Sequence, residues 1–191
     1  MAKPARSFPT SEPFPVSTIG HSTRTIAEFV DILRGGGVQL VIDVRTVPRS
    51  RTNPQYNEEV LGESLARFQI GYARIAGLGG LRGRSRDVPP EVNGFWINRS
   101  FHNYADHALS PEFVESLGEL MARAAQRPTA IMCSEAVWWR CHRRIIADHL
   151  LARGCPVQHL MGAGRIEPAK MTPGAVVSGE RVTYPARADR A

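Results

Sequence analysis

The chain has 191 residues, a formal net charge of +6 and a hydrophobic content of 42%. These values fit one globular domain with an ordinary core, and no apolar run is long enough to span a bilayer, so we expect neither an integral membrane protein nor a membrane partner. Lys3 and Lys170 are the only lysines among 24 basic residues, and this excess of arginine has two explanations, GC-rich codon usage and an anionic partner.

The N-terminal segment 1–15 combines prolines with polar residues and lacks the apolar stretch of a secretory signal. We interpret this segment as a disordered leader. The cysteines are Cys133, Cys141 and Cys155. An odd number of cysteines without a secretory signal argues against a disulfide framework and indicates a reducing, cytoplasmic location.

In the first half of the chain, apolar runs alternate with segments of helical periodicity. The expected strands are residues 16–21, 40–45 and 70–76, and the expected helices begin near Ile26 and Glu58. The second strand is almost continuously apolar, which is typical of a parallel strand covered on both faces. Proline-, glycine- and arginine-rich loops follow the second and third strands.

The second half continues the same alternation. The expected helices are part of 93–108, a firmer helix that starts at Pro111 with Ser110 as its cap, and 143–151, while the expected strands are 129–132 and 157–161. This order predicts a three-layer α/β fold with a mostly parallel β-sheet of about five strands flanked by helices. We therefore expect a single α/β domain over residues 16–161 and an irregular C-terminal tail over 162–191.

Reactive side chains follow three of the predicted strands. His21 ends the first strand, Asp43 the second, and Cys133 and Glu135 the fourth. In open α/β sheets the carboxyl ends of parallel strands share one edge, and ligands bind there. We expect these four side chains, together with His142 from the following helix, to form a catalytic site.

These residues also have structural interpretations. A carboxylate inside an apolar strand, such as Asp43, must be paired or hydrogen-bonded, and Arg45 or Arg143 would serve as its partner if it is not catalytic. Glu135 faces the same choice. Cys133 precedes a helix N-terminus, so its thiol pKa would be lowered and it would act as a nucleophile; alternatively it is a small buried hydrophobe.

The segment 133–144 also raises the question of a metal site. Cys133, Cys141 and His142 are possible donors, with His21 as a further candidate. The Cys-x7-Cys-His spacing, however, matches no common structural zinc motif, and packing on a helical face is the alternative for Cys141. We therefore predict no metal and no cofactor.

Two basic loops follow predicted strands. The loop 46–57 holds arginines and amides between prolines, which suits a phosphate or a nucleotide, and its alternative is a solvated surface. The loop 77–86 offers backbone amides to an anion but has neither the Rossmann nor the P-loop pattern. The expected substrate-binding residues are Arg45, Arg49, Asn53, Tyr56, Gly79, Gly80, Arg82 and Arg143.

Four ordered motifs carry a resemblance to a known family. They are Thr18-Ile19-Gly20-His21-Ser22, Asp43-Val44-Arg45 with Pro48-Arg49-Ser50-Arg51, Leu78-Gly79-Gly80, and Cys133-Ser134-Glu135 with Cys141-His142-Arg143. With these motifs the chain resembles the domain-of-unknown-function 488 family over residues 16–161. The resemblance implies a cytosolic bacterial α/β domain and no particular reaction, and the tail lies outside it.

Three functions are compatible with these patterns. The first is an enzyme, a hydrolase or a transferase, that binds a phosphorylated or nucleotide-like substrate at the strand ends. The second is a non-catalytic nucleic-acid-binding protein, which the positive charge favours and the lack of a standard motif disfavours. The third is thiol or metal chemistry at Cys133 and Cys141. The expected partner is thus a small anionic ligand or a nucleic acid.

Overall fold

The computed structural model describes residues 14–162 and 164–186 of the chain. Most of the expected leader therefore lies outside the described residues. The strands are β1 (Val16–Gly20), β2 (Leu40–Asp43), β3 (Gly71–Arg74), β4 (Thr129–Cys133), β5 (Val157–Gly162), β6 (Arg165–Pro168), β7 (Val176–Ser178) and β8 (Arg181–Thr183). The helices are α1 (Ile26–Gly35), α2 (Glu58–Ala66), α3 (Arg99–His107), α4 (Pro111–Ala124) and α5 (Arg143–Ala152).

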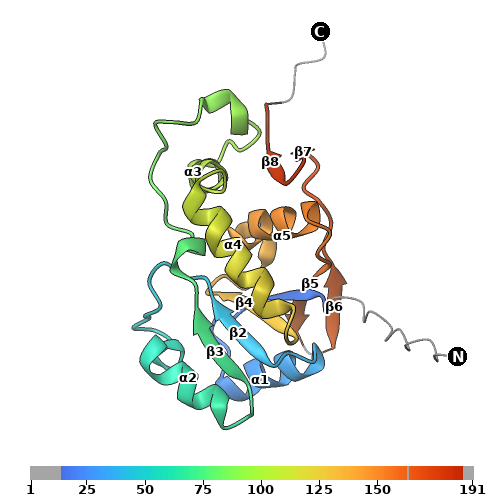
Figure 1. The fold of residues 1–191 in the computed structure, drawn as a ribbon. Helices are drawn as coiled ribbons and strands as arrows, with labels where there is room; N and C mark the ends of the chain where they lie inside the picture. The colour runs from blue at the N-terminus through green and yellow to red at the C-terminus, as the bar shows by residue number, and fades with distance from the viewer. Residues whose placement is uncertain (1–13, 163, 187–191) are drawn as a thin grey trace, which may run out of the picture.

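The central sheet has the strand order β3-β2-β4-β1-β5-β6 (Figure 1). Strands β1 to β5 run parallel, and β6 pairs antiparallel with β5. This arrangement confirms the predicted three-layer α/β class with a mostly parallel sheet. Within the described residues, no helix is both long and apolar enough to cross a bilayer.

Local sequence signals explain where two of the helices begin. Thr25 caps α1 in a reciprocal capping box with Glu28, which satisfies backbone donors at the helix start. Ser110 accepts a hydrogen bond from the backbone N–H of Phe113, and Pro111 occupies the first position of α4. These caps fix the ends of the helices that cover the sheet.

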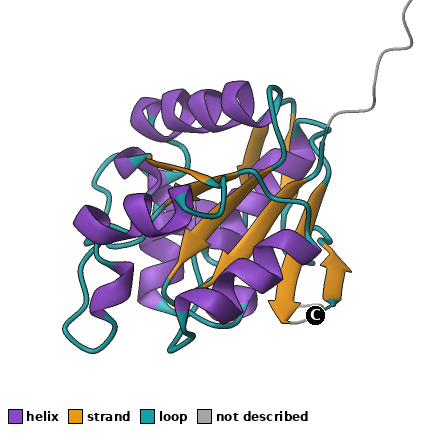
Figure 2. Cartoon of the chain, turned by 90° about the horizontal axis from the view of Figure 1, so that it is seen from below, coloured by secondary structure: helices purple, strands orange, loops and turns teal. Residues whose placement is uncertain are grey.

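Helices cover both faces of the sheet (Figures 1 and 2). Phe29 and Leu61, from α1 and α2, lie in the core on one face. Tyr104, Phe113 and Ile145, from α3, α4 and α5, lie in the core on the other. β4 lies between β1 and β2 in the sheet. The helices that follow β1 and β2 cover one face of the sheet, whereas α5, which follows β4, covers the other face. The connections that leave the tips of these three strands therefore turn to opposite faces. Such a switch point is where α/β sheets bind ligands.

The C-terminal segment differs from the sequence prediction of an irregular tail. It contains β6 at the sheet edge and the β7–β8 hairpin, which contacts α5. β6 was missed because it is short and mostly exposed, with Arg165 and Glu167 on either side of Ile166. Charged residues of this kind are common on edge strands, where they discourage pairing with other chains.

Tyr184 anchors this segment to the core. The Tyr184 hydroxyl donates to Oδ2 of Asp148 over 2.8 Å, and both side chains are buried. The second carboxylate oxygen of Asp148 accepts from the backbone N–H of Thr172 over 2.9 Å. Burial raises the pKa of Asp148 above its ordinary value. The tail and α5 thus share a buried polar network.

Replacing Tyr184 by phenylalanine should lower the free energy of unfolding by about 1–3 kcal/mol, because one buried oxygen of Asp148 loses its donor. Urea unfolding measures the change. Tyr56→Phe is the matched control, since its hydroxyl makes only a 3.4 Å contact with the Thr25 carbonyl, and it should cost less. Equal stability of the Tyr184 variant and the wild type would contradict the anchoring role.

Candidate functional site

A pocket of about 750 Å³ opens at the carboxyl ends of β1, β2 and β4. The loops that follow these three strands line it, together with the turn at Gly80 and Leu81. The pocket is therefore located at the switch point of the sheet. Of the predicted site residues, those that line it are His21, Arg45, Arg49, Asn53, Gly80, Cys133, Glu135 and His142.

Asp43 lies beneath the pocket and holds Arg45 in place. Its Oδ1 accepts from the backbone N–H and from Nε of Arg45, each over 2.9 Å. Its Oδ2 accepts from the Tyr72 hydroxyl over 2.9 Å. Arg45 Nη2 also donates to the Tyr56 carbonyl over 2.7 Å. Because Asp43 is fully buried and Arg45 nearly so, this ion pair has a fixed geometry.

His21 completes this network. Its Nδ1 lies 2.8 Å from the Ser22 carbonyl and therefore carries the proton, so Nε2 accepts from Arg45 Nη1 over 3.3 Å. The ring stacks on Tyr56 at 4.0 Å between centroids. Burial, and to a lesser degree the charge of Arg45, lowers the pKa of His21 to about 4. A neutral imidazole with both nitrogens engaged suits the positioning of Arg45 better than proton transfer.

Backbone hydrogen bonds continue past the ends of β1 and β4 and hold the loops after the two strands together. Backbone N–H groups of His21 and Ser22 donate to the carbonyls of Cys133 and Ser134, each over 2.9 Å. Ser22 has a φ of 50°, which is unusual for a residue other than glycine and is frequent at functional sites. A Cβ on Gly20 would lie 1.8 Å from the Glu135 carbonyl oxygen. Glycine is thus required at position 20 for the backbone of β1 to pack against the backbone of Glu135. The exposed side chain of Glu135 lies at the pocket.

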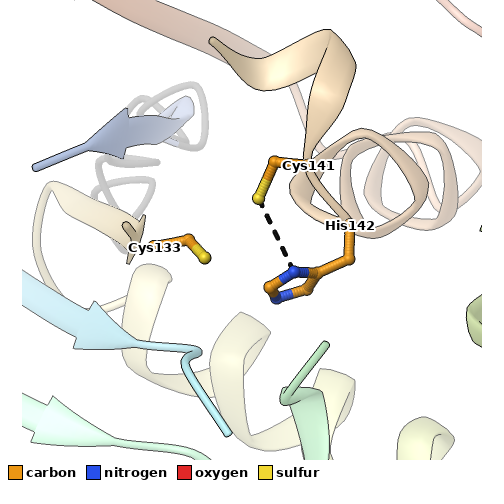
Figure 3. Close-up of side chains that lie close together, drawn as sticks. All are labelled: Cys133, Cys141 and His142. Carbon is orange, nitrogen blue, oxygen red and sulfur yellow. Dashed lines mark hydrogen bonds between the residues drawn. The ribbon is translucent and has the colours of Figure 1, made fainter. Parts of the chain in front are cut away.

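Two cysteines and a histidine meet beside the pocket (Figure 3). Cys133 is the last residue of β4, while Cys141 and His142 immediately precede α5, and their donor atoms all lie within 4.8 Å of one another. Cys141 Sγ is 3.6 Å from His142 Nδ1. His142 Nε2 lies 3.0 Å from the Val44 carbonyl, so it donates there and leaves the Nδ1 lone pair facing the thiols.

The two thiols have opposite acidities. A hydrogen bond to Cys141, together with burial, raises the pKa of Cys133 to about 12. Burial alone would raise the pKa of Cys141, but the hydrogen bond from Cys133 and the adjacent Arg143 lower it to about 6. Arg143 Nε donates to Cys141 Sγ over 3.2 Å. Of the two interpretations of Cys133, the lowered thiol pKa is not what the structure gives: Cys141 and burial raise it, and Arg143 contacts the other thiol.

The two basic loops converge through Thr46. Its Oγ1 accepts from the backbone N–H of Leu81 over 2.8 Å, and a Cβ on Gly79 would come within 2.7 Å of the same oxygen. Ser50 and Asn57 bridge the first loop internally over 2.7 Å. These contacts bring both loops to the rim of the same pocket.

Other predicted residues lie outside the lining of the pocket. Arg82 donates to the carbonyls of Gly77 and Gly79 and pairs with Glu112. Arg143 is buried behind Cys141, and its Nη2 donates to the Glu135 carbonyl. The structure therefore gives these two arginines internal partners. Tyr56 likewise lies beneath the lining, where it stacks on His21. Gly79 lies beside the lining and packs against Thr46.

Arg140 is a charged lining residue that the predicted site residues do not include. A short 3-10 helix, Trp138–Arg140, turns the chain so that this exposed side chain lines the pocket. It pairs with no carboxylate in residues 14–162 and 164–186. The only sequence signal was its place in the reactive segment 133–144.

Comparison with protein families gives one match, to a domain of unknown function, DUF488, over residues 25–150. The chain belongs to the DUF488 family. The matched range of this DUF488 chain contains the Asp43–Arg45 pair and the cysteine–histidine cluster, and it excludes His21 and the strands after α5. No curated protein and no solved structure matches the chain.

Proposed function

We propose that this DUF488 domain is an enzyme, a hydrolase or a transferase, which binds a phosphorylated or nucleotide-like substrate in the pocket at the tips of β1, β2 and β4. The observation that carries the proposal is the charge of the lining. Arg45, Arg49 and Arg140 line the pocket, and Glu135 is the only acidic residue of the described chain that does so.

The three arginines differ in how free they are to bind an anion. Arg140 has no carboxylate partner in the described chain and is exposed, so it binds without breaking an existing pair. Arg45 is held by Asp43 and by the Tyr56 carbonyl, so its guanidinium already has a fixed orientation before an anion binds. Arg49 pairs with Glu59 at the exposed rim, where ion pairs are weak and readily exchanged. Hydroxyl and amide groups of Ser50 and Asn53 add neutral hydrogen-bonding partners.

Glu135 is the residue that we assign to proton transfer. Its side chain is exposed at the pocket, where it would take a proton from the attacking group, water in a hydrolase or an acceptor hydroxyl in a transferase. Asp43 is less suited to this role because Arg45 and Tyr72 occupy its oxygens. In this proposal Asp43 and His21 position Arg45, and Arg45 and Arg140 hold the anion.

The binding step is tested with phosphate, sugar phosphates and nucleotides by thermal shift and calorimetry. A ligand present at 100 times its Kd should add about 2.7 kcal/mol of stability. Arg140→Ala should weaken binding about 10- to 100-fold, since a hydrogen bond to a charged group contributes about 1.5–3 kcal/mol. Arg67→Ala, which removes an exposed arginine at the C-terminal end of α2 that pairs with Glu63 and does not line the pocket, is the matched control and should bind like the wild type.

The same ligand separates binding from catalysis. Glu135→Gln should retain the affinity and lose turnover by about 10²–10⁴-fold, the usual contribution of a general base. If no anion stabilises the protein, or if Arg140→Ala binds as tightly as wild type, the pocket assignment is wrong. Stabilisation by oligonucleotides only, with a steep decline as salt rises, would instead establish the nucleic-acid-binding function.

The proposal includes a cytoplasmic location. All three cysteines lie in the described part of the chain and are free thiols. Two of them are adjacent at the pocket, and a reducing compartment would keep such a pair from oxidising.

A further inference from the structure

We propose that Cys133, Cys141 and His142 form a metal site that binds one zinc ion and leaves a fourth coordination position open to the pocket. The family match assigns no metal, and the Cys-x7-Cys-His spacing gives no motif. The proposal depends instead on how the fold brings the tip of β4 against the start of α5 (Figure 3).

The separation of the donor atoms fits a tetrahedral ion. Zn–S bonds of about 2.3 Å and Zn–N bonds of about 2.0–2.1 Å, at tetrahedral angles, place sulfur about 3.6 Å from nitrogen and two sulfurs about 3.8 Å apart. Cys141 Sγ lies 3.6 Å from His142 Nδ1, and all three donors lie within 4.8 Å of one another. Small side-chain rotations would therefore complete the coordination.

The surrounding contacts prepare the donors as ligands. His142 Nε2 donates to the Val44 carbonyl, so Nδ1 presents its lone pair. A backbone carbonyl on the far nitrogen is the usual partner of a metal-binding histidine, because it fixes the tautomer and the ring orientation. Arg143 Nε donates to Cys141 Sγ, and an N–H donor from a cation supports a thiolate.

Gly80 packs against the face of the His142 ring. A Cβ on this residue would lie 2.4 Å from Nδ1, 2.8 Å from Cε1 and 2.9 Å from Cγ, so glycine is needed for the ring to occupy the position from which we assign it to the metal. Gly80, Cys133 and His142 all line the pocket. No fourth histidine, cysteine or carboxylate joins the cluster in the described residues, and the nitrogens of His21 are already engaged.

A site with three protein ligands and one open position is typical of catalytic zinc, whereas structural zinc is usually held by four. Because Cys133 and His142 line the same pocket as Glu135 and Arg140, a fourth ligand would reach the ion from that pocket. A zinc ion there would lower the pKa of a bound water to about 7 and so supply a nucleophile. The metal site itself does not depend on the proposed function, because its test needs no substrate.

The experiment titrates reduced, chelator-treated protein with Co²⁺, a spectroscopic substitute for zinc. We expect one equivalent to bind, with sulfur-to-cobalt charge-transfer bands and the intense visible bands of tetrahedral cobalt, and we expect Zn²⁺ to displace it. Cys133→Ser, Cys141→Ser and His142→Ala should each weaken binding by more than about 100-fold, because even the loss of an outer-shell partner costs 10- to 100-fold.

Cys155→Ser is the matched control, since Cys155 is the third free cysteine and lies outside the cluster; it should bind like the wild type. Circular dichroism shows whether each variant is folded. A second measurement uses wild-type protein alone: zinc should protect two of the three thiols from a thiol reagent, and a chelator should restore their reactivity. Absence of the charge-transfer bands, or no protection by zinc, would overturn the metal site whatever the outcome of the anion screen.

Discussion

Asp43→Asn should destabilise the fold by about 3–5 kcal/mol, the cost of removing one partner from a buried ion pair. Asp43 is fully buried and accepts hydrogen bonds from Arg45 and Tyr72. Asparagine keeps the shape of the side chain but loses its charge. Arg45 is only 5% exposed, so its guanidinium would remain in the interior without a counterion.

Urea unfolding at neutral pH measures this loss. The matched control is Asp31→Asn on the exposed face of α1, which should change stability by less than about 0.5 kcal/mol. Adding Arg45→Met to the Asp43 variant should restore part of the stability, because the orphaned charge is removed. If the single variant lost less than about 1 kcal/mol of unfolding free energy, Asp43 would not be the counterion that stabilises buried Arg45.

Gly20→Ala should cost at least about 3 kcal/mol, the upper end of the usual range for inserting a methyl group into a packed site. The added Cβ would lie 1.8 Å from the Glu135 carbonyl oxygen and 2.7 Å from its carbon. These are backbone atoms, so no side chain can rotate away. The tips of β1 and β4 would have to separate, and Glu135 would move with them.

Gly118→Ala provides the opposite outcome in the same chain. Gly118 lies inside α4, with no atom within 4 Å of an added Cβ, so alanine should stabilise the helix by about 0.5–1 kcal/mol. Thermal or urea unfolding compares the two variants. A neutral Gly20 variant would mean that the two strand tips are not in the close contact described above.

Much of the fold follows from local patterns in the sequence. The five parallel strands overlap the predicted strands 16–21, 40–45, 70–76, 129–132 and 157–161, and Ser110 with Pro111 marks the start of α4. β6, β7 and β8 could not be predicted in this way, because they are short and largely exposed. The order of the strands in the sheet could not be predicted from local sequence patterns either, since β4 lies between β1 and β2 through pairing between distant segments.

The candidate site shows the same division. Convergence of His21, Asp43, Cys133 and Glu135 followed from the rule that parallel strands end at one edge. The structure places His21, Cys133 and Glu135 in the lining of one pocket, whereas Asp43 is fully buried beneath it. The choice of partner was harder. Asp43 had two candidate arginines, and only the fold shows that it pairs with Arg45 while Arg143 is occupied by Cys141 and by the Glu135 carbonyl. The proximity of the thiols and His142 likewise depends on the turn at Trp138–Arg140.

The position of β1 at the centre of the sheet has a consequence for biosynthesis. Its partners are β4 and β5, which pair Ser17 with Ala130 and Val16 with Val157. During translation, β1 therefore leaves the ribosome long before β4 and β5 have been synthesised. Its apolar side chains remain unburied until most of the chain has been made. Such distant pairings slow folding and expose unpaired strands to aggregation. We therefore expect this chain to depend on chaperones while it is nascent.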